Sequence, residues 1–158
     1  LFSSYIDTDE DDEKILLARF LECVGIAKAL LGREINNARK EIAGTKIVRE
    51  IFAKSEDKRI IILDQNLPWS KVLIPELEAL YVVYPRKGGS WGVRAIPKCL
   101  IGFESKKPLP QSWGGKGAIE LAKLTGVEDA IFCHKGLFIC VTETKEGAIK
   151  LAEIALNA

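Results

Sequence analysis

The sequence predicts an α+β fold in which two long N-terminal helices precede a mixed sheet of about five strands with helices packed on it. Three observations support this fold class. Apolar residues recur at intervals of three and four before residue 54, short β-rich runs separated by turn residues begin near residue 58, and a helical pattern closes the chain. With 47% hydrophobic and 28% charged residues, the 158-residue chain has enough apolar material for a cored domain with a helical extension.

The first helix is predicted to begin at Glu13 and to end near Gly32. Its apolar face consists of Ile15, Leu16, Phe20, Cys23, Val24, Ala27, Leu30 and Leu31. A second helix is predicted from about Ile35 to Ala53, although Gly44 weakens its middle. Together the two helices suggest an αα-hairpin that links an absent N-terminal domain to the following one. The predicted division is a helical linker or extension over 1–57 and an α+β lobe over 58–158.

The predicted lobe is ordered around a β-hairpin. Two β-rich runs, 80–84 and 91–96, are joined by a loop with Gly88 and Gly89. Strict alternation places Gly92, Arg94 and Ile96 on one face of the second run. The other predicted elements are a strand over 59–63, a brief helix over 69–76, an irregular loop over 106–117, a helix over 118–124, strands over 130–133 and 137–141, and a helix over 145–156 capped by Thr144.

The composition excludes several classes of protein. There is no run of roughly 20 uninterrupted apolar residues and no signal segment, so no membrane partner is expected. The four cysteines form no CxxC pair, so a zinc site and a disulfide framework are not expected, and reduced thiols indicate a cytoplasmic location. Because the chain starts at Leu1 and has no methionine, we expect an N-terminal part to be missing.

The net charge of +1 conceals an asymmetry along the chain. Six of the 22 acidic residues precede Lys14, which leaves 23 basic and 16 acidic residues over 14–158, a balance of +7. The early acidic cluster favours the N-terminus of the first helix. The basic remainder suits a polyanionic ligand without requiring one.

The residue inventory argues against self-contained catalysis. After Glu13 the chain has only Asp57, Asp64 and Asp129 as aspartates and His134 as its single histidine, with no DHH triplet or HxD arrangement. A two-metal phosphoesterase site needs more ligands than these. Cys133 adjoins His134 on a predicted strand, where successive side chains point to opposite faces, so a Cys–His nucleophile is not expected. We therefore predict no catalytic residue and no metal ligand in this chain.

Two places could present polar groups to an anion. His134, at a strand end, is either a turn histidine that hydrogen-bonds the backbone or a group offered to a phosphate or base. The turn over 144–147 is either a simple helix cap or a phosphate site formed by exposed N–H groups. In addition, aromatic and basic residues are interleaved at strand ends and in loops, which suits base stacking, although each tryptophan also suits a core position.

Several segments also occur together, in the same order, in a known family. They are Leu67–Lys71, Tyr84–Pro85, Trp91–Lys98, Pro108–Trp113, Ile131–Ile139 and Thr144–Ala148. In these segments the chain resembles the C-terminal part of the melanocyte-proliferating-gene-type exonucleases, relatives of the DHH phosphoesterases. The resemblance covers roughly residues 67–156, and the preceding helical region is only loosely similar.

The resemblance implies the C-terminal, substrate-binding part of a metal-dependent phosphohydrolase or exonuclease that acts on RNA, single-stranded nucleic acid or nucleotides. A DHH-like N-terminal lobe, absent from this chain, would hold Mn²⁺ or Mg²⁺. The positions carried over for gripping phosphate or ribose are Arg94, His134, Thr144 and Gly147, with Lys98 and Trp69 behind them. The competing hypothesis is a non-catalytic module, derived from such a lobe, for interaction or homo-oligomerisation.

The chain departs from the family at one segment. Similar members place a Gly-Gly pair and then His or Asn where this chain has Cys140, Val141, Thr142 and Glu143. A glycine pair lets a ligand approach the backbone closely, whereas Cys140 and Val141 should obstruct it and Glu143 should repel phosphate. Either the substrate differs, its grip has moved, or the lobe has lost nucleotide binding.

Overall fold

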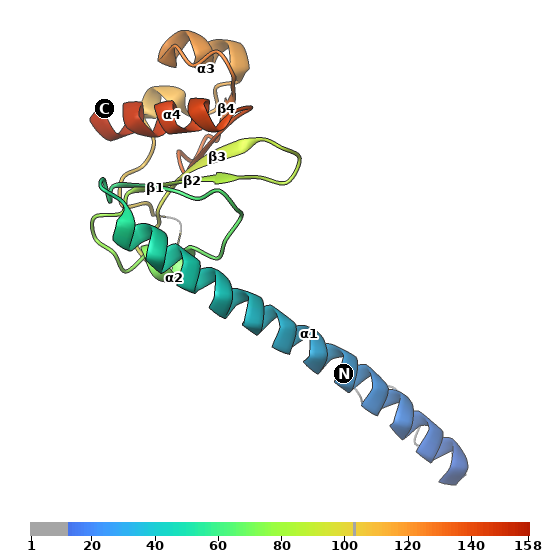
Figure 1. Cartoon of the computed structure of the whole chain (residues 1–158). Coiled ribbons are helices and arrows are strands. Elements are labelled where there is room, and N and C mark those ends of the chain that lie inside the picture. Colours follow the sequence, from blue (N-terminus) through green and yellow to red (C-terminus); the bar gives the residue numbers. More distant parts are fainter. Residues whose placement is uncertain (1–12, 103) are drawn as a thin grey trace. The chain divides into compact units, whose positions relative to one another are not determined.

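The structure, a computed structural model, describes residues 13–102 and 104–158. Its elements are α1 (Glu13–Lys54), β1 (Ile60–Ile62), α2 (Ser70–Leu73), β2 (Tyr81–Pro85), β3 (Trp91–Ala95), the 3₁₀ turn η2 (Gln111–Trp113), α3 (Ala118–Thr125), β4 (Ala130–Cys133), β5 (Ile139–Thr142) and α4 (Lys145–Asn157) (Figure 1). The α+β fold class, with its mixed sheet and packed helices, is confirmed. The predicted loop over 106–117 is correct except for η2, which places Trp113 in the core.

The prediction of two N-terminal helices is wrong, because α1 is one continuous helix of 42 residues. Gly32 does not end a helix; it stays helical, and a Cβ there would meet nothing within 4 Å. A glycine inside a helix costs about 1 kcal/mol relative to alanine. That cost alone does not stop a helix whose following residues are good helix formers and include no proline. The αα-hairpin is therefore absent from the described residues.

The chain divides into two compact units, Leu1–Ile42 and Ala43–Ala158. In the first unit, the described residues 13–42 are helical throughout. The last part of α1, residues 43–54, belongs to the second unit, where Gly44 and Val48 are buried. The predicted boundary after residue 57 separates a linker from a substrate-binding lobe. The division into compact units does not test that boundary, so the boundary stays a prediction. Among the described residues, no helix is both long and apolar enough to cross a bilayer.

The sheet of the second unit has the strand order β1-β2-β3-β5-β4. β1 is parallel to β2, and the other neighbours are antiparallel. The β2–β3 hairpin forms as predicted, and its loop contains Gly88 (φ 93°) and Gly89 (φ 88°), two consecutive residues in a region that favours glycine. The edge strands are β1 and β4.

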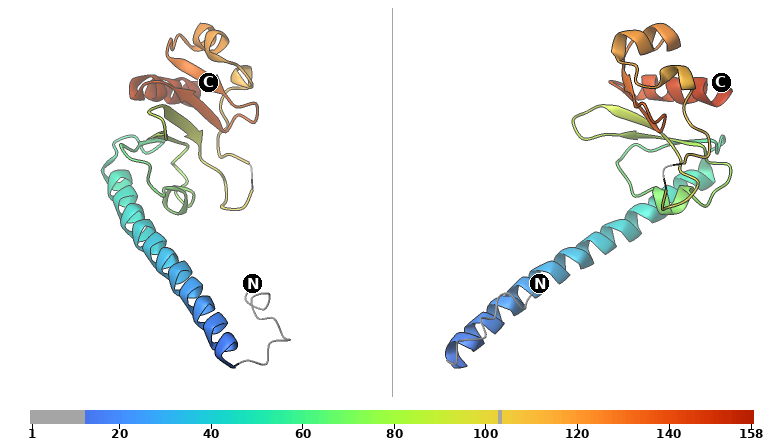
Figure 2. Two further views of the ribbon diagram at one scale, coloured as in Figure 1. Left: turned by 90° about the vertical axis from the view of Figure 1, so that its right-hand side faces the viewer. Right: turned by 180° about the vertical axis from the view of Figure 1, so that it is seen from behind.

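Each face of the sheet has its own hydrophobic cluster. On one face, α3 and α4 cover the sheet, and Leu151 and Ala152 of α4 pack on Val83, Val93 and neighbouring strand residues. On the other face, α2 and residues 43–54 of α1 cover β1 and β2 (Figure 2). That second cluster includes Val48, Ile61, Leu73, Val82 and Ile96. On the second face, the helices thus cover the part of the sheet formed by β1 and β2.

Tyr81 links the first cluster to two carbonyl groups. Its side chain is buried, and its hydroxyl donates to the carbonyl oxygens of Pro108 (3.2 Å) and Ala155 (3.3 Å). Burial raises the pKa of Tyr81 to about 12. The neutral phenol is therefore favoured in the folded state, and its contribution to stability is present below pH 10 and is lost as the pH rises towards 12.

We expect Tyr81→Phe to lower the free energy of unfolding by about 1 kcal/mol at pH 8, because the hydrogen bonds are lost while the ring packing is kept. The difference from the parent should shrink above pH 10, where only the parent has to keep this phenol neutral. Urea titrations of both proteins at pH 8 and pH 10.5 measure the difference, since all other groups titrate alike in the two. A difference that does not change with pH would contradict the assignment.

Candidate functional site

Arg94 lies near the end of β3, on the face of the sheet opposite α3 and α4. Its Cα pairs with Val82 of β2 and Ile139 of β5, so these side chains share one cross-strand row. His134 extends the row, because its N–H donates to the carbonyl of Ile139 (2.9 Å) at the end of β4. Arg94 and His134 are therefore on the same face, on either side of Ile139.

Phe138 joins these two residues. The guanidinium carbon of Arg94 lies 5.1 Å from the centre of the Phe138 ring, which is the range of a cation–π contact. The imidazole of His134 lies 4.3 Å from the same ring, tilted by 45°. Among the described residues, the Arg94 guanidinium has no carboxylate partner. Its charge is therefore available to an anion.

The neighbouring row adds a second arginine. Gly92 pairs with Tyr84 and Val141, and a Cβ on Gly92 would lie 3.1 Å from Cδ of Arg86 and 3.4 Å from Cζ of Tyr84. The missing side chain thus lets Arg86 and Tyr84 lie over the strand. The two rows, together with Arg86 and Phe138 beside them, form what we call the arginine face. It is made of Tyr84, Arg86, Gly92, Arg94, Phe132, His134, Phe138, Ile139 and Val141. It combines two guanidinium groups with several aromatic rings.

The turn between β4 and β5 fixes the histidine. Nδ1 of His134 accepts the N–H of Gly136 (2.9 Å), so in the neutral ring the proton is on Nε2. The turn histidine that binds its own backbone is therefore the arrangement observed, and the exposed ring still offers an Nε2–H donor. Leu137 has a φ of 58°, an uncommon conformation for leucine, and its carbonyl accepts the N–H of Leu109 (2.9 Å). This bond and the packing of its side chain hold the turn in place.

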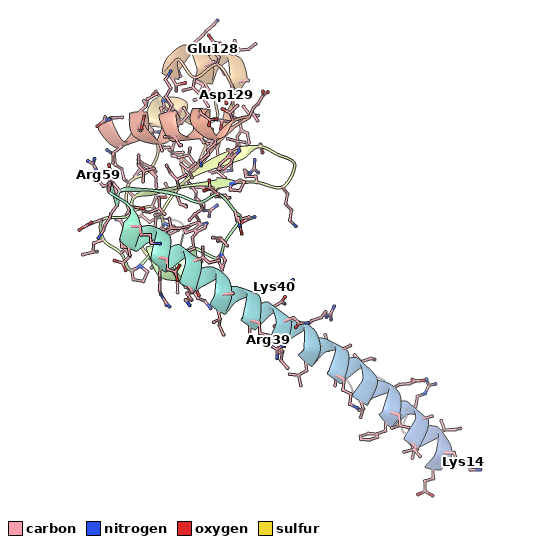
Figure 3. All side chains as sticks on the ribbon, in the orientation of Figure 1. Lys14, Arg39, Lys40, Arg59, Glu128 and Asp129 are labelled. Atoms are coloured by element: carbon pink, nitrogen blue, oxygen red, sulfur yellow. The ribbon has the colours of Figure 1, made fainter. Side chains whose placement is uncertain are left out.

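Thr144 is bound by a carboxylate of the chain itself, and Gly147 is bound by Thr144. The hydroxyl of Thr144 accepts the N–H of Gly147 (3.0 Å), which confirms the predicted cap of α4. Asp129 accepts both the N–H (2.9 Å) and the hydroxyl (2.5 Å) of Thr144. Figure 3 shows Asp129 at the end where α4 begins. A phosphate at this helix end would therefore have to displace the Asp129 carboxylate.

The other two candidates lie apart from Arg94 and His134. Lys98 forms an exposed ion pair with Glu104, in the loop that follows β3. Trp69 is partly buried against the second hydrophobic cluster, just before α2. The structure thus brings together Arg94 and His134, adds Arg86 and Phe138, and leaves Thr144 and Gly147 at the opposite end of β5.

A large surface hollow of the second unit has a different character. Its volume is about 860 Å³, and it is lined by Glu56, Asp57, Lys58, Arg59, Leu77, Glu78 and Leu80. Arg59 is paired with Asp57 (2.7 Å) and lowers the pKa of that carboxyl to about 2. With its one arginine engaged and its other carboxylates exposed, this hollow is a poor site for a polyanion.

Comparison with known proteins identifies the family. Residues 2–156 match the sequence profile named MYG1_exonuc and described as Uncharacterised protein family (UPF0160). The chain belongs to the MYG1 exonuclease family. The resemblance found in the motifs is thereby confirmed. No solved structure matches the chain.

Three relatives show how much of the family the chain covers. A MYG1 protein of Schizosaccharomyces pombe is 33% identical over 150 residues, 87% of this chain and 46% of that protein. The MYG1 exonuclease of Homo sapiens is 33% identical over 84 residues, 53% of this chain and 22% of that protein. A MYG1 protein of Chlamydia muridarum is 29% identical over 130 residues, 78% of this chain and 45% of that protein. The chain thus spans at most about half the length of these MYG1 relatives.

The part of this chain that the structure describes contains no group of three His, Cys, Asp or Glu side chains that could hold a metal ion. The divalent ion implied by the resemblance therefore has no candidate ligand set among these residues. Cys133 is buried and faces Cys140 across the β4–β5 ladder, on the face opposite His134. It is accordingly not placed to act with that histidine.

The segment where this chain departs from the MYG1 pattern is β5 itself. Cys140 points into the first hydrophobic cluster, and a hydrogen bond with Cys133, together with burial, raises the pKa of its thiol. Val141 is buried on the arginine face beside Gly92. A glycine pair would leave the backbone of β5 open to a ligand. In this chain the side chain of Cys140 occupies the core side of that strand, and the side chain of Val141 occupies the side of the arginine face. The glycine of the arginine face is instead Gly92, one strand away.

Proposed function

We propose that the arginine face binds single-stranded nucleic acid or a nucleotide, and that this chain is the substrate-binding part of a metal-dependent exonuclease or phosphohydrolase. The observation that carries the proposal is the convergence of Arg86 and Arg94 with the rings of Phe138 and His134 on one face. Relatives from Homo sapiens and Mus musculus bear the name MYG1 exonuclease. We further propose that a metal-binding lobe outside this chain supplies the catalytic Mn²⁺ or Mg²⁺ and that the protein is cytoplasmic.

The chemistry of the face fits such a ligand. A guanidinium presents several N–H donors in a plane and can bind two phosphate oxygens at once. The Nε2–H of His134 supplies a further donor beside Arg94. Phe138 and Phe132 offer ring surfaces for base stacking, which tolerates any base sequence. The arrangement suits a single nucleic-acid strand whose phosphates contact the arginines and whose base sequence is recognised little.

We expect Arg94→Ala to weaken the binding of a short single-stranded RNA by about 5- to 10-fold, because one charge-assisted phosphate contact contributes roughly 1 to 1.5 kcal/mol. The slope of the logarithm of affinity against the logarithm of salt concentration should fall by about 0.7, as for one phosphate contact to a single strand. Fluorescence anisotropy at several salt concentrations measures both quantities.

A matched arginine variant provides the control. Arg59→Ala removes a guanidinium that is paired with Asp57, so it should leave binding nearly unchanged. Single-stranded DNA and free nucleoside monophosphate, used as competitors, distinguish the ligand classes. If Arg94→Ala binds as well as the parent, or if Arg59→Ala loses as much affinity, the arginine face is not the binding site.

A second candidate function, a non-catalytic interaction module, is favoured by the exposed apolar side chains of α1. Leu17, Leu31 and Ile42 are 57%, 62% and 71% exposed. Such a concentration of exposed apolar residues on one element marks an interaction surface.

A further inference from the structure

Part of the exposed apolar surface of α1 follows a seven-residue repeat. Leu17, Leu21, Val24, Leu31, Ile35, Ala38 and Ile42 occupy the core positions a and d of successive heptads, with Lys28 at the remaining place. These residues form one continuous stripe because α1 runs without a break through Gly32. Five of these side chains, Leu17, Leu21, Leu31, Ile35 and Ile42, are 44–71% exposed.

A sustained heptad is typical of a helix that packs along another helix. A straight α-helix has 3.6 residues per turn, so a strict seven-residue repeat drifts by about 20° per heptad and keeps facing a partner only if the two helices supercoil. Residues 17–42 extend over roughly 39 Å at 1.5 Å per residue. Burying a leucine or isoleucine side chain contributes roughly 1.5–3 kcal/mol, so leaving this stripe in water is unfavourable.

The charges beside the stripe indicate which partner fits. Glu34 and Glu41 occupy position g, and Arg39 and Lys46, five residues after each, occupy position e. In a parallel pair of identical helices, position g of one helix lies next to position e of the following heptad in the other, so Glu34 meets Arg39 of the second copy. In an antiparallel pair, g would lie beside g, and acidic residues would meet acidic residues. The charge pattern therefore fits a second copy in parallel orientation.

We propose that residues 17–42 of α1 form a parallel two-stranded coiled coil with a second copy of this chain. Ile35 and Ile42 at position a with Leu17 and Leu31 at position d follow the preference for two strands. Lys28, a polar residue at position a, limits the register and the number of strands. After residue 42, α1 packs against its own chain, and Gly44 lies against Pro68 within the second unit. The surface offered to a partner copy thus ends where α1 is engaged by its own chain.

The first test is the oligomeric state. Sedimentation equilibrium of the chain between about 1 and 100 µM should show a dimer. Leu31→Glu should raise the dissociation constant of the dimer at least 100-fold, because the substitution places two carboxylates, one from each copy, in the apolar interface between the helices. The matched control is Ala29→Glu, at an exposed position outside this interface, which should leave the dimer unchanged. A chain that is monomeric throughout, or a dimer that survives Leu31→Glu, overturns the proposal. In the first case, another segment of the longer MYG1 proteins or a different protein would be the partner.

Charge reversal tests the pairing between copies. Glu34→Arg should weaken the dimer severalfold by placing arginine beside Arg39 of the second copy, and the double variant Glu34→Arg with Arg39→Glu should restore it. Residues five apart are not neighbours on a single helix, so the rescue depends on contact between two chains. Failure of the double variant to restore the dimer would overturn the parallel register.

Cross-linking tests the orientation directly. In a background with Cys23 and Cys99 replaced by serine, Leu31→Cys should form an intermolecular disulfide on mild oxidation, because equivalent d positions face each other in a parallel pair. Ala29→Cys in the same background should not. A stable dimer that cross-links equally at both positions, or at neither, would overturn the parallel arrangement.

Discussion

Replacing Gly44 with alanine is expected to destabilise the second unit by about 2 kcal/mol, although alanine is the better helix former. A Cβ at this position would lie 2.5 Å from Cδ and 2.8 Å from Cγ of Pro68. Both atoms belong to a ring, which cannot rotate away. Either α1 or the loop before α2 would have to move, and the packing of Val48 and Leu67 in the second hydrophobic cluster would loosen.

The same substitution elsewhere in α1 provides the control. A Cβ on Gly32 would meet nothing within 4 Å, so Gly32→Ala should stabilise the helix by up to about 1 kcal/mol. Urea unfolding followed by tryptophan fluorescence reports on the second unit, where all three tryptophans lie, and circular dichroism reports on the helix. Two substitutions of the same kind in one helix should thus have opposite signs. Equal effects would mean that Gly44 is not confined by Pro68.

Gly32 and Gly44 also show how far local sequence predicts this fold. The β2–β3 hairpin, β4 and the cap of α4 are predicted correctly, because each depends on turn or capping residues beside a short periodic run. The predicted stop at Gly32 is wrong, since glycine ends a helix only where the following residues leave the helical path. Local sequence marks Gly44 only as a weak helix former, whereas its role depends on Pro68, which lies far along the chain.

The candidate site is predictable to a similar extent. Alternation along the hairpin is sufficient to place Arg94 and Gly92 on one face. Arg86 shares that parity, so the same rule can add it. Phe138 cannot be added in this way, because its place between Arg94 and His134 depends on the register of β3 against β5, two strands separated by more than 40 residues. Whether this face binds nucleic acid stays a prediction.

Gly147→Ala is expected to lower the free energy of unfolding by about 2 kcal/mol, through Asp129. A Cβ on Gly147 would overlap the carboxylate of Asp129, which accepts the N–H (2.9 Å) and the hydroxyl (2.5 Å) of Thr144. The carboxylate would have to turn away, and both hydrogen bonds at the start of α4 would be lost. Losing an N-terminal cap of this kind costs about 0.5–2 kcal/mol, and crowding adds to it.

A double-mutant cycle separates this mechanism from a general loss of packing. In the Asp129→Ala background the obstacle is gone, so Gly147→Ala should be neutral or stabilise α4 by up to about 1 kcal/mol, since alanine favours a helix. The coupling between the two substitutions should therefore be about 2 kcal/mol or more. Additive effects would show that Gly147 is small for some reason other than the carboxylate.

A different substitution of Asp129 tests the helix end as a phosphate site. Asp129→Asn removes the negative charge but keeps an oxygen that can accept the N–H of Thr144. If a substrate phosphate binds at this helix end, as the resemblance implies, Asp129→Asn should increase RNA affinity about 3- to 10-fold, because phosphate no longer competes with a carboxylate. If phosphate is gripped only at the arginine face, Asp129→Asn should leave affinity unchanged while Arg94→Ala still lowers it. Comparing these two variants therefore assigns the phosphate grip to one end of β5 or the other.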